Sequence, residues 1–233
     1  MKTCVVIPTY NEEKEIGSLV LGIRDQGLSA MVVDDGSTDN TVRIAEKAGA
    51  VVLCNLKNHG KGASLIKGFD YALTHGFDAV VTMDGDGQHL VRDLPAFLSA
   101  AEHSGSGVFI GNRMHSPKNM PAHRFITNAI MSLFVSGLVR QKIPDTQCGF
   151  RLIKSNVLEK LNLMTSNYEI ETEILIKAAS IGLRIESVPI STVYAGEKSR
   201  INPFIDTLRF LRYIVRELWT SNFRNSGKVG GQG

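Results

Sequence analysis

The sequence predicts an α/β fold in which a Rossmann-like, mostly parallel sheet is flanked by helices. In the first half of the chain, short β-rich runs alternate with segments of helical periodicity, which is typical of βαβ units. These runs are almost continuously apolar, as expected for strands that are covered on both faces. Acidic residues follow several of the runs directly, at the strand ends where open parallel sheets bind their ligands.

The predicted elements form one large domain with a helical extension. In the first half, the strands are predicted at 3–7, 30–33, 50–54, 79–83 and 108–110, and the helices at 13–25, 39–48, 61–75 and 93–103. In the second half, we expect helices near 123–139, 155–161 and 168–181, a strand pair near 184–194 and an amphipathic helix at 203–219. The domain boundaries are therefore predicted as a main domain over 1–200, a C-terminal amphipathic helix over 201–222 and a disordered tail over 223–233.

The composition excludes several classes of protein. The net charge of +3 is too small to indicate a nucleic-acid partner. The three cysteines lie far apart, which argues against a disulfide framework or a zinc site, and Cys4 and Cys54 are expected to be buried thiols in a reducing cytosol. No signal peptide precedes the first strand, and no apolar run is long enough to span a membrane. We therefore expect a soluble or peripheral protein.

Three loops at predicted strand ends carry the chemistry. They are Pro8 to Glu12, Asp34 to Ser37 and Asp84 to His89. In the third loop, Asp84 and Asp86 are two residues apart, and carboxylates without thiols suit Mg²⁺ or Mn²⁺. Such an ion normally shares its coordination with phosphate oxygens, so the pattern points to a diphosphate ligand. The alternative is a solvated turn rich in aspartate and glycine.

A second candidate for phosphate binding is the segment His59 to Gly62, which opens a predicted helix. It lacks the Walker spacing, and no G-x-G-x-x-G motif is present there, so a kinase or a dinucleotide-binding protein is disfavoured. Lys61 is then either a diphosphate contact or a solvated residue at the start of a helix. Paired acids also occur in phospho-acceptor receiver domains, but that hypothesis leaves the motifs further along the chain unexplained.

Five motifs occur in a fixed order and together resemble the family 2 glycosyltransferases, in particular the polyprenyl-phosphate (dolichyl-phosphate) mannose or glucose synthases. The resemblance covers about residues 3–200. The motifs are Val6–Glu12, Asp34–Ser37, the Asp84-Gly85-Asp86 loop, Gly111-Asn112-Arg113 and Asp145–Arg151. The resemblance implies a GT-A fold and inversion at the anomeric carbon. The Gln-x-x-Arg-Trp motif of processive synthases is absent, so transfer of a single sugar is favoured.

The resemblance also assigns the donor side of the site. The donor would be a nucleotide diphosphate sugar such as GDP-mannose or UDP-glucose. Asp84 would lie near the ribose and the metal, with Asp86 and Gln88 as metal ligands. The first two loops add nucleotide contacts, and the segment after residue 195 resembles one that closes over the donor. The full set of predicted nucleotide-sugar contacts is Pro8, Tyr10, Glu12, Asp34, Asp35, Lys61, Asp84, Lys198 and Arg200. Lys198 and Arg200 can equally belong to an ordinary solvated charge run.

Two kinds of acceptor remain open. A sugar or protein hydroxyl must lose a proton as it attacks, and Asp145 is the carboxylate nominated as its base. A lipid phosphate is already anionic and needs cationic positioning, which arginine forks supply. In that case Asp145 would orient Arg151 or the acceptor region. The arginine candidates for the acceptor phosphate are Arg113, Arg124 and Arg151, and the resemblance places that phosphate at Arg124 and Asn128. The residues nominated for catalysis are Asp86, Arg113 and Asp145.

Two segments predict contact with a lipid surface. Residues 125–139 are uncharged and mostly apolar, a length that suits a buried or interfacial helix. Residues 203–219 form a basic amphipathic pattern that can lie on a membrane, on its own domain or on a second subunit of a homo-oligomer. The expected location is the cytoplasmic face of a membrane. Three glutamates at 169, 171 and 173 are interpreted as structural residues at a helix start.

Overall fold

The computed structural model describes residues 1–117, 120–192, 209–210 and 212–215. The chain divides into two compact units, Met1–Ala195 and Gly196–Gly233. In the second unit, residues 209–210 and 212–215 are helical, within the predicted helix 203–219. The rest of that helix, the predicted tail and the candidate residues Lys198 and Arg200 lie outside the described residues.

The first unit contains a seven-stranded sheet in the order β3-β2-β1-β4-β6-β5-β7. Strands β1 to β4 pair in parallel, and so do β5 and β7, whereas β6 runs antiparallel to both of its neighbours. The predicted mostly parallel sheet is therefore confirmed. The bounds are β1 Thr3–Thr9, β2 Ser29–Asp34, β3 Val51–Cys54, β4 Ala79–Thr82, β5 Val108–Asn112, β6 Arg151–Lys154 and β7 Ile185–Pro189.

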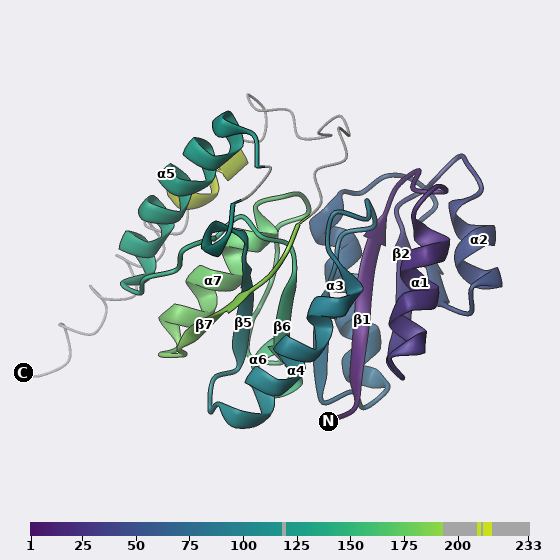
Figure 1. Cartoon of the computed structure of the whole chain (residues 1–233), viewed down its shortest axis with the longest axis horizontal. Coiled ribbons are helices and arrows are strands. Elements are labelled where there is room, and N and C mark those ends of the chain that lie inside the picture. The colour runs from purple at the N-terminus through teal and green to yellow at the C-terminus, as the bar shows by residue number, and fades with distance from the viewer. Residues whose placement is uncertain (118–119, 193–208, 211, 216–233) are drawn as a thin grey trace, which may run out of the picture. The chain divides into compact units, whose positions relative to one another are not determined.

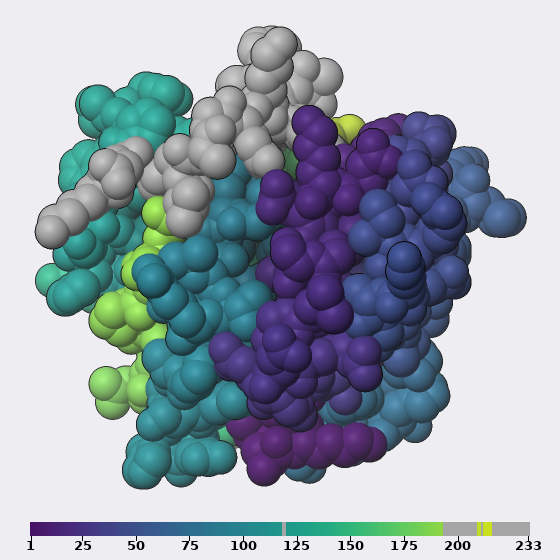
Figure 2. Space-filling model, turned by 45° about the vertical axis from the view of Figure 1, so that its right-hand side comes forward, coloured from purple at the N-terminus to yellow at the C-terminus, as the bar shows by residue number. Residues whose placement is uncertain are grey.

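Helices cover the sheet along its whole width. Figure 1 shows α1 and α2 beside β1 and β2 at one end, and α7 and α5 beside β5 and β7 at the other. In the space-filling view of Figure 2, the purple N-terminal segment lies between blue and teal segments, in keeping with the central place of β1. The bounds are α1 Ile16–Asp25, α2 Thr41–Lys47, α3 Lys61–Thr74, α4 Leu94–His103, α5 Ala122–Val139, α6 Ser155–Leu158 and α7 Ile170–Ser180, with short 3-10 turns at Val91–Asp93 and Arg113–His115.

The core lies between the central strands and these helices. Val5, Val6 and Ile7 of β1 are fully buried, as are Val80 and Val81 of β4. Continuous apolar runs are the pattern of strands covered on both faces, and these two strands follow it. The buried centre of the sheet holds the strand ends, and with them the polar loops, in fixed positions.

One strand was missed from the sequence, and two predictions about strand residues were wrong. The strand β6 was not predicted, because its four residues begin with an arginine and follow a motif that looks like a loop. The strand pair near 184–194 is a single strand, β7, which pairs with β5, while Thr192 only forms an isolated bridge to His89. The strand β3 lies at the edge of the sheet, so Cys54 is exposed, whereas Cys4 is buried as expected.

Helix α5 carries an outward-facing apolar surface. By length and composition it is the one helix among the described residues that could cross a membrane, a criterion that core helices also meet. A core helix would be mostly buried, yet only Ser132, Val135 and Val139 of α5 are buried. Its exposed large apolar residues are Phe125, Ile126, Ile130, Leu133 and Phe134. Of the two alternatives for this segment, a buried or an interfacial helix, the exposure of α5 excludes a helix packed wholly in the core.

Candidate active site

The loop that follows β4 places Asp84 beside a buried lysine from the start of α3. The Nζ atom of Lys61 lies 2.5 Å from Oδ1 of Asp84 and 2.6 Å from Oε1 of Glu171, which comes from the first turn of α7. On its other side, Oδ2 of Asp84 lies 3.4 Å from Nε2 of His89. Lys61 is therefore an ion-pairing residue between two carboxylates, and the alternative of a solvated helix start is excluded.

The charges in this cluster depend on one another. Burial alone would lower the pKa of Lys61, but the nearby Asp84 and Glu171 raise it well above its usual range. Burial would likewise raise the pKa of Asp84, but Lys61 and His89 lower it well below the usual range. Both side chains are thus held in their charged forms at neutral pH.

The pKa of Asp86 is shifted in the direction opposite to that of Asp84. Burial raises the pKa of its carboxyl group, and the negative charge of Asp84 raises it further. Its Oδ1 atom accepts a hydrogen bond from the backbone N–H of Gln88 at 3.0 Å. A second carboxylate whose ionisation is disfavoured by the first is stabilised when a cation binds between them.

A divalent cation fits this loop as part of a ternary site. The described residues contain no group of three histidine, cysteine, aspartate or glutamate side chains that could hold a metal by themselves. Mg²⁺ is usually bound by one or two carboxylates together with substrate phosphates and water. Asp84 and Asp86 match this pattern, with the half-buried Gln88 next to them. When bound, the ion would neutralise charge on a leaving diphosphate.

Glycines leave the room that this cluster needs. A Cβ atom on Gly149 would lie 2.6 Å from Oδ2 of Asp84 and 3.0 Å from Nζ of Lys61. A Cβ atom on Gly85 would lie 2.8 Å from Cγ2 of Thr9 at the end of β1. The carbonyl of Gly149 accepts a 2.6 Å hydrogen bond from Oγ1 of Thr82, which ties the strand before Asp84 to this glycine. No larger residue fits beside the ion pair without displacing it.

The two aspartates after β2 shape their loops from within. Asp34 is buried and accepts hydrogen bonds from the backbone of Gly36 and from Ser37. Asp35, also buried, accepts hydrogen bonds of 2.8–2.9 Å from the side chain of Asn55 and from the backbone N–H groups of His59 and Gly60. Asp35 thus links the end of β2 to residues 59–60, which directly precede Lys61. Contact of either aspartate with a nucleoside remains a prediction.

The loop after β1 lies beside the loop after β2. Asn11 has a positive φ of 54°, and its N–H donates to Oγ of Ser37 at 2.8 Å. The N–H of Glu12 donates to Oγ1 of Thr41 at 2.8 Å. Tyr10 is 37% exposed at this edge, and Pro8 is paired with Val33 within the sheet. The structure therefore brings Tyr10 and Glu12 to the same edge of the sheet as Asp35.

On the other side of β4, Arg113 and Asp145 form a forked ion pair. Nε and Nη2 of Arg113 donate to the two oxygens of Asp145 at 2.7 and 2.8 Å, and the backbone N–H of Arg113 donates at 3.0 Å. Asp145 is completely buried. A carboxylate whose two oxygens both accept hydrogen bonds from a guanidinium is a weaker general base than a free carboxylate. This pair disfavours the nomination of Asp145 as a base, which stays a prediction, and the partner of Asp145 is Arg113 rather than Arg151.

Arg151 occupies the interior beneath the loops. Its side chain is 1% exposed and donates to the carbonyl oxygens of Cys148, Glu171 and Thr146. Burial lowers the pKa of the guanidinium, although Glu171 opposes this change. Because its donors are used on backbone carbonyls inside the protein, Arg151 does not present a surface to an acceptor phosphate. This prediction is wrong, and Arg151 is a residue that stabilises the fold.

The other acceptor candidates lie on one stripe of α5. Arg124, Asn128 and Ser132 are spaced four residues apart, so they share a face of the helix. Oγ of Ser132 accepts a 2.9 Å hydrogen bond from the N–H of Thr146, the residue next to Asp145. This face of α5 therefore begins its contact with the Asp145–Thr146 segment at Ser132. Asn128 lies one helical turn before Ser132, and Arg124 lies two turns before it.

Two residues of the site escaped sequence analysis. Glu171 was interpreted as a structural residue of a helix start, although its side chain contacts Lys61. His89 is buried, its Nδ1 atom has no hydrogen-bond partner, and its ring lies 5.3 Å from that of Phe150. The position of His89 directly after the acidic loop was a usable signal. For Glu171 the sequence carries no signal, because its partner is 110 residues away.

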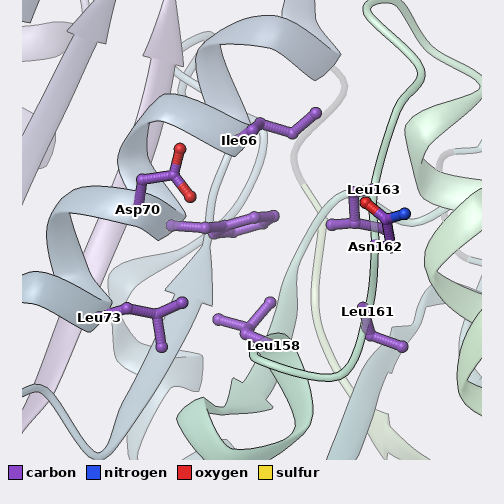
Figure 3. A pocket seen from close by; sticks show the side chains of 8 residues that line it. Ile66, Asp70, Leu73, Leu158, Leu161, Asn162 and Leu163 are labelled. Atoms are coloured by element: carbon purple, nitrogen blue, oxygen red, sulfur yellow. The ribbon is translucent and has the colours of Figure 1, made fainter.

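A hollow of about 290 Å³ lies elsewhere, between α3 and the segment that follows α6 (Figure 3). Its lining is mostly apolar and consists of Ile66, Phe69, Asp70, Leu73, Leu158, Leu161, Asn162 and Leu163. It includes none of the predicted site residues. The chemistry-bearing side chains are instead gathered in the loops at the strand ends.

Comparison with known proteins gives a consistent result. The model of glycosyl transferase family 2 matches residues 4–161. The chain is 31% identical over 215 residues to the dolichyl-phosphate hexose transferase of Haloferax volcanii, covering 91% of this chain and 92% of that protein. It is 29% identical over 204 residues to the polyprenol monophosphomannose synthase of Mycolicibacterium smegmatis, covering 82% and 77%.

Among solved structures, the fold is similar to that of glucosyl-3-phosphoglycerate synthase from Mycobacterium tuberculosis, in a complex with Mn²⁺, UDP and glucosyl-3-phosphoglycerate. The TM-score is 0.72 at 19% identity, with coverage of 94% of this chain and 79% of that chain. At this identity the likeness concerns the fold alone, and it agrees with the mostly parallel sheet and flanking helices described above.

Proposed function

The chain belongs to glycosyl transferase family 2, and on that premise we propose that it moves a single hexose from a nucleotide diphosphate sugar to a polyprenyl or dolichyl phosphate. The proposed sugar is mannose or glucose, carried by a donor such as GDP-mannose or UDP-glucose. The names of the relatives from Haloferax volcanii and Mycolicibacterium smegmatis support this class of acceptor. The proposed cofactor is Mg²⁺ or Mn²⁺.

The observation that carries the proposal is the fork between Arg113 and Asp145. The fork occupies both oxygens of the carboxylate nominated as a base, and it holds the guanidinium of Arg113 in a fixed orientation. An acceptor hydroxyl needs a base, whereas a phosphate monoester is already anionic near neutral pH and needs a positioned cation. The site is therefore better suited to a phosphate acceptor than to a hydroxyl.

The proposed reaction is an in-line displacement with inversion. An oxygen of the acceptor phosphate forms a bond to the anomeric carbon, and the bond from that carbon to the diphosphate breaks. The electron pair of the broken bond leaves with the nucleoside diphosphate. Arg113, together with Arg124 and Asn128 of α5, orients the acceptor, and Asp84, Asp86 and Lys61 hold the diphosphate side. Catalysis then comes mainly from positioning and from fixed charges.

An assay of nucleoside diphosphate release tests this proposal. The purified chain would be given GDP-mannose, UDP-glucose and N-acetylhexosamine donors in turn, with Mg²⁺ or Mn²⁺, and with or without a polyprenyl phosphate. We expect rapid release from one donor only when the lipid phosphate is present, and a glycolipid product that can be extracted. If release of nucleoside diphosphate does not require the lipid phosphate and depends on a soluble glycan or protein hydroxyl, the result would instead support the alternative acceptor.

We further propose that α5 contacts the membrane in which such an acceptor resides, with the protein peripheral on the cytoplasmic face. The exposed apolar residues of α5 cover several turns, and basic residues flank them at Arg124, Arg140 and Lys142. A helix of this kind lies in the interface with its apolar side in the acyl boundary and its basic ends near anionic headgroups. The acceptor stripe of α5 would then be adjacent to the lipid surface.

The change Leu133→Glu is expected to weaken binding to anionic phospholipid vesicles. Leu133 is 77% exposed, and losing the transfer of one leucine into lipid corresponds to about 1.5–3 kcal/mol, or roughly tenfold or more in affinity. Sedimentation with vesicles measures the effect. Leu21→Glu is the matched control, because Leu21 is 51% exposed on α1. Equal vesicle binding by the wild type and Leu133→Glu would contradict the membrane role of α5.

A further inference from the structure

We propose that Glu171 is a positioning residue that holds the ammonium group of Lys61 when a metal ion recruits Asp84. This inference rests on the proposed function of the acidic loop as a metal site. Lys61 has two anionic partners, and only one of them, Asp84, belongs to the predicted metal loop. Glu171 comes from α7, more than eighty residues further along the chain, and is not part of that loop.

The geometry places the two partners in competition for one cation. Nζ of Lys61 is 2.5 Å from Asp84 and 2.6 Å from Glu171, and these three side chains are only 12–28% exposed. A metal that binds Asp84 takes negative charge away from Lys61. With Glu171 in place, the lysine keeps a carboxylate partner at contact distance. Lys61 then remains charged and fixed beside the ion, where a diphosphate is bound.

The backbone of Glu171 is anchored independently of its side chain. Its carbonyl oxygen accepts a hydrogen bond from Nη1 of the buried Arg151. Lys61 is held from the opposite direction, because Gly60 and Gly62 lie against the segment Thr165–Asn167, where a Cβ atom would clash with backbone oxygens at 2.3 and 2.4 Å. Both ends of the Lys61–Glu171 contact are therefore fixed by packing, as a positioning role requires.

A neighbouring glutamate shows what a structural role on the same helix looks like. Glu173 is 1% exposed, and its carboxylate accepts hydrogen bonds from the backbone of Met164, and from the backbone and side chain of Thr165. It also pairs with Lys177. Among the described residues, the side chain of Glu171 has Lys61 as its hydrogen-bonding partner instead of a loop backbone. Glu173 is thus a matched control for a purely structural glutamate.

The test measures equilibrium binding of Mn²⁺ by electron paramagnetic resonance, without turnover, in the presence of UDP and, in a second series, of GDP. In Glu171→Gln, Asp84 becomes the one carboxylate beside Lys61 and is held by it, so we expect apparent Mn²⁺ affinity to fall at least tenfold. In the double variant Lys61→Met, Glu171→Gln, Asp84 is released, and the affinity should recover by most of that factor. Glu173→Gln should lower the melting temperature and leave Mn²⁺ affinity within about twofold.

The possible failures are distinguishable. If the wild-type protein binds Mn²⁺ neither with UDP nor with GDP, the proposed metal site itself is wrong. If the wild type binds and Glu171→Gln binds equally well, the positioning role of Glu171 is overturned while the metal site stands. An equal loss in Glu171→Gln and in the double variant also overturns it, because the effect then does not act through Lys61. A Glu171→Asp variant that restores part of the affinity supports it.

Discussion

Asp86→Ala is expected to lower the rate of sugar transfer by about 10²–10³-fold or more, the range seen when one electrostatic stabiliser of a transition state is removed. Asp86 is one of the two proposed carboxylate ligands of the cation, so we expect its removal to act mainly through loss of that cation. Asp86 contributes little to the stability of the fold, since its carboxylate accepts a hydrogen bond from the backbone N–H of Gln88 within its own loop. Release of nucleoside diphosphate at saturating donor measures the effect.

The stability of this variant provides the control. Ionised Asp86 next to ionised Asp84 is unfavourable in the absence of a cation, so Asp86→Ala should unfold at the same temperature as the wild type or at a higher one. Asp70→Asn, which changes an exposed aspartate of α3, should leave both transfer and stability unchanged. Transfer by Asp86→Ala within a few-fold of the wild type would refute the assignment of the acidic loop to a metal.

Asp145→Asn is expected to reduce both stability and transfer. Removing one partner of a buried ion pair typically costs about 3–5 kcal/mol, and Asp145 is completely buried against Arg113. The amide of an asparagine also places a donor opposite a guanidinium. We therefore expect a clear fall in melting temperature, together with a higher KM for polyprenyl phosphate because Arg113 loses its orientation. Thermal unfolding and the acceptor dependence of transfer measure the two effects.

A double variant separates this role from that of a base. Arg113→Leu with Asp145→Leu removes both charges and should recover most of the lost stability, while transfer to the lipid phosphate stays low. A general base would behave differently: the wild type would transfer sugar to a glycan or protein hydroxyl rather than to polyprenyl phosphate, and Asp145→Asn would abolish that transfer. That result would reinstate Asp145 as a base and favour a glycan or protein acceptor.

The sequence predicted the fold class and the residues that begin each site loop, because both depend on local pattern. The apolar runs of β1 and β4 and the polar residues after them can be read without knowing what lies next to them. The strand β6 could not be found in this way, since its four residues acquire strand character only from pairing with β4 and β5. Cys54 was misjudged for a similar reason, because an edge strand and a central strand share the same local pattern.

The assignments of charged residues show the same limit. Arg151 and Arg113 have the same chemistry, but one lies in the interior and the other at a loop, and only the topology separates them. Glu171 and Glu173 sit two residues apart, yet one contacts Lys61 and the other supports a loop backbone. Residue type and spacing thus predict the chemistry that is available, whereas long-range packing decides which side chain carries it.

The place of β6 between β4 and β5 also sets the distance between the two loops of the site. In the register of the sheet, Arg151 lies between Thr82 of β4 and Ile110 of β5. The acidic loop follows β4 and Arg113 follows β5, so the proposed donor and acceptor groups begin two strand spacings apart, about 10 Å. One transferred sugar ring must bridge that width. The distance between the strand ends that carry the two loops is therefore set by the sheet, before either substrate binds.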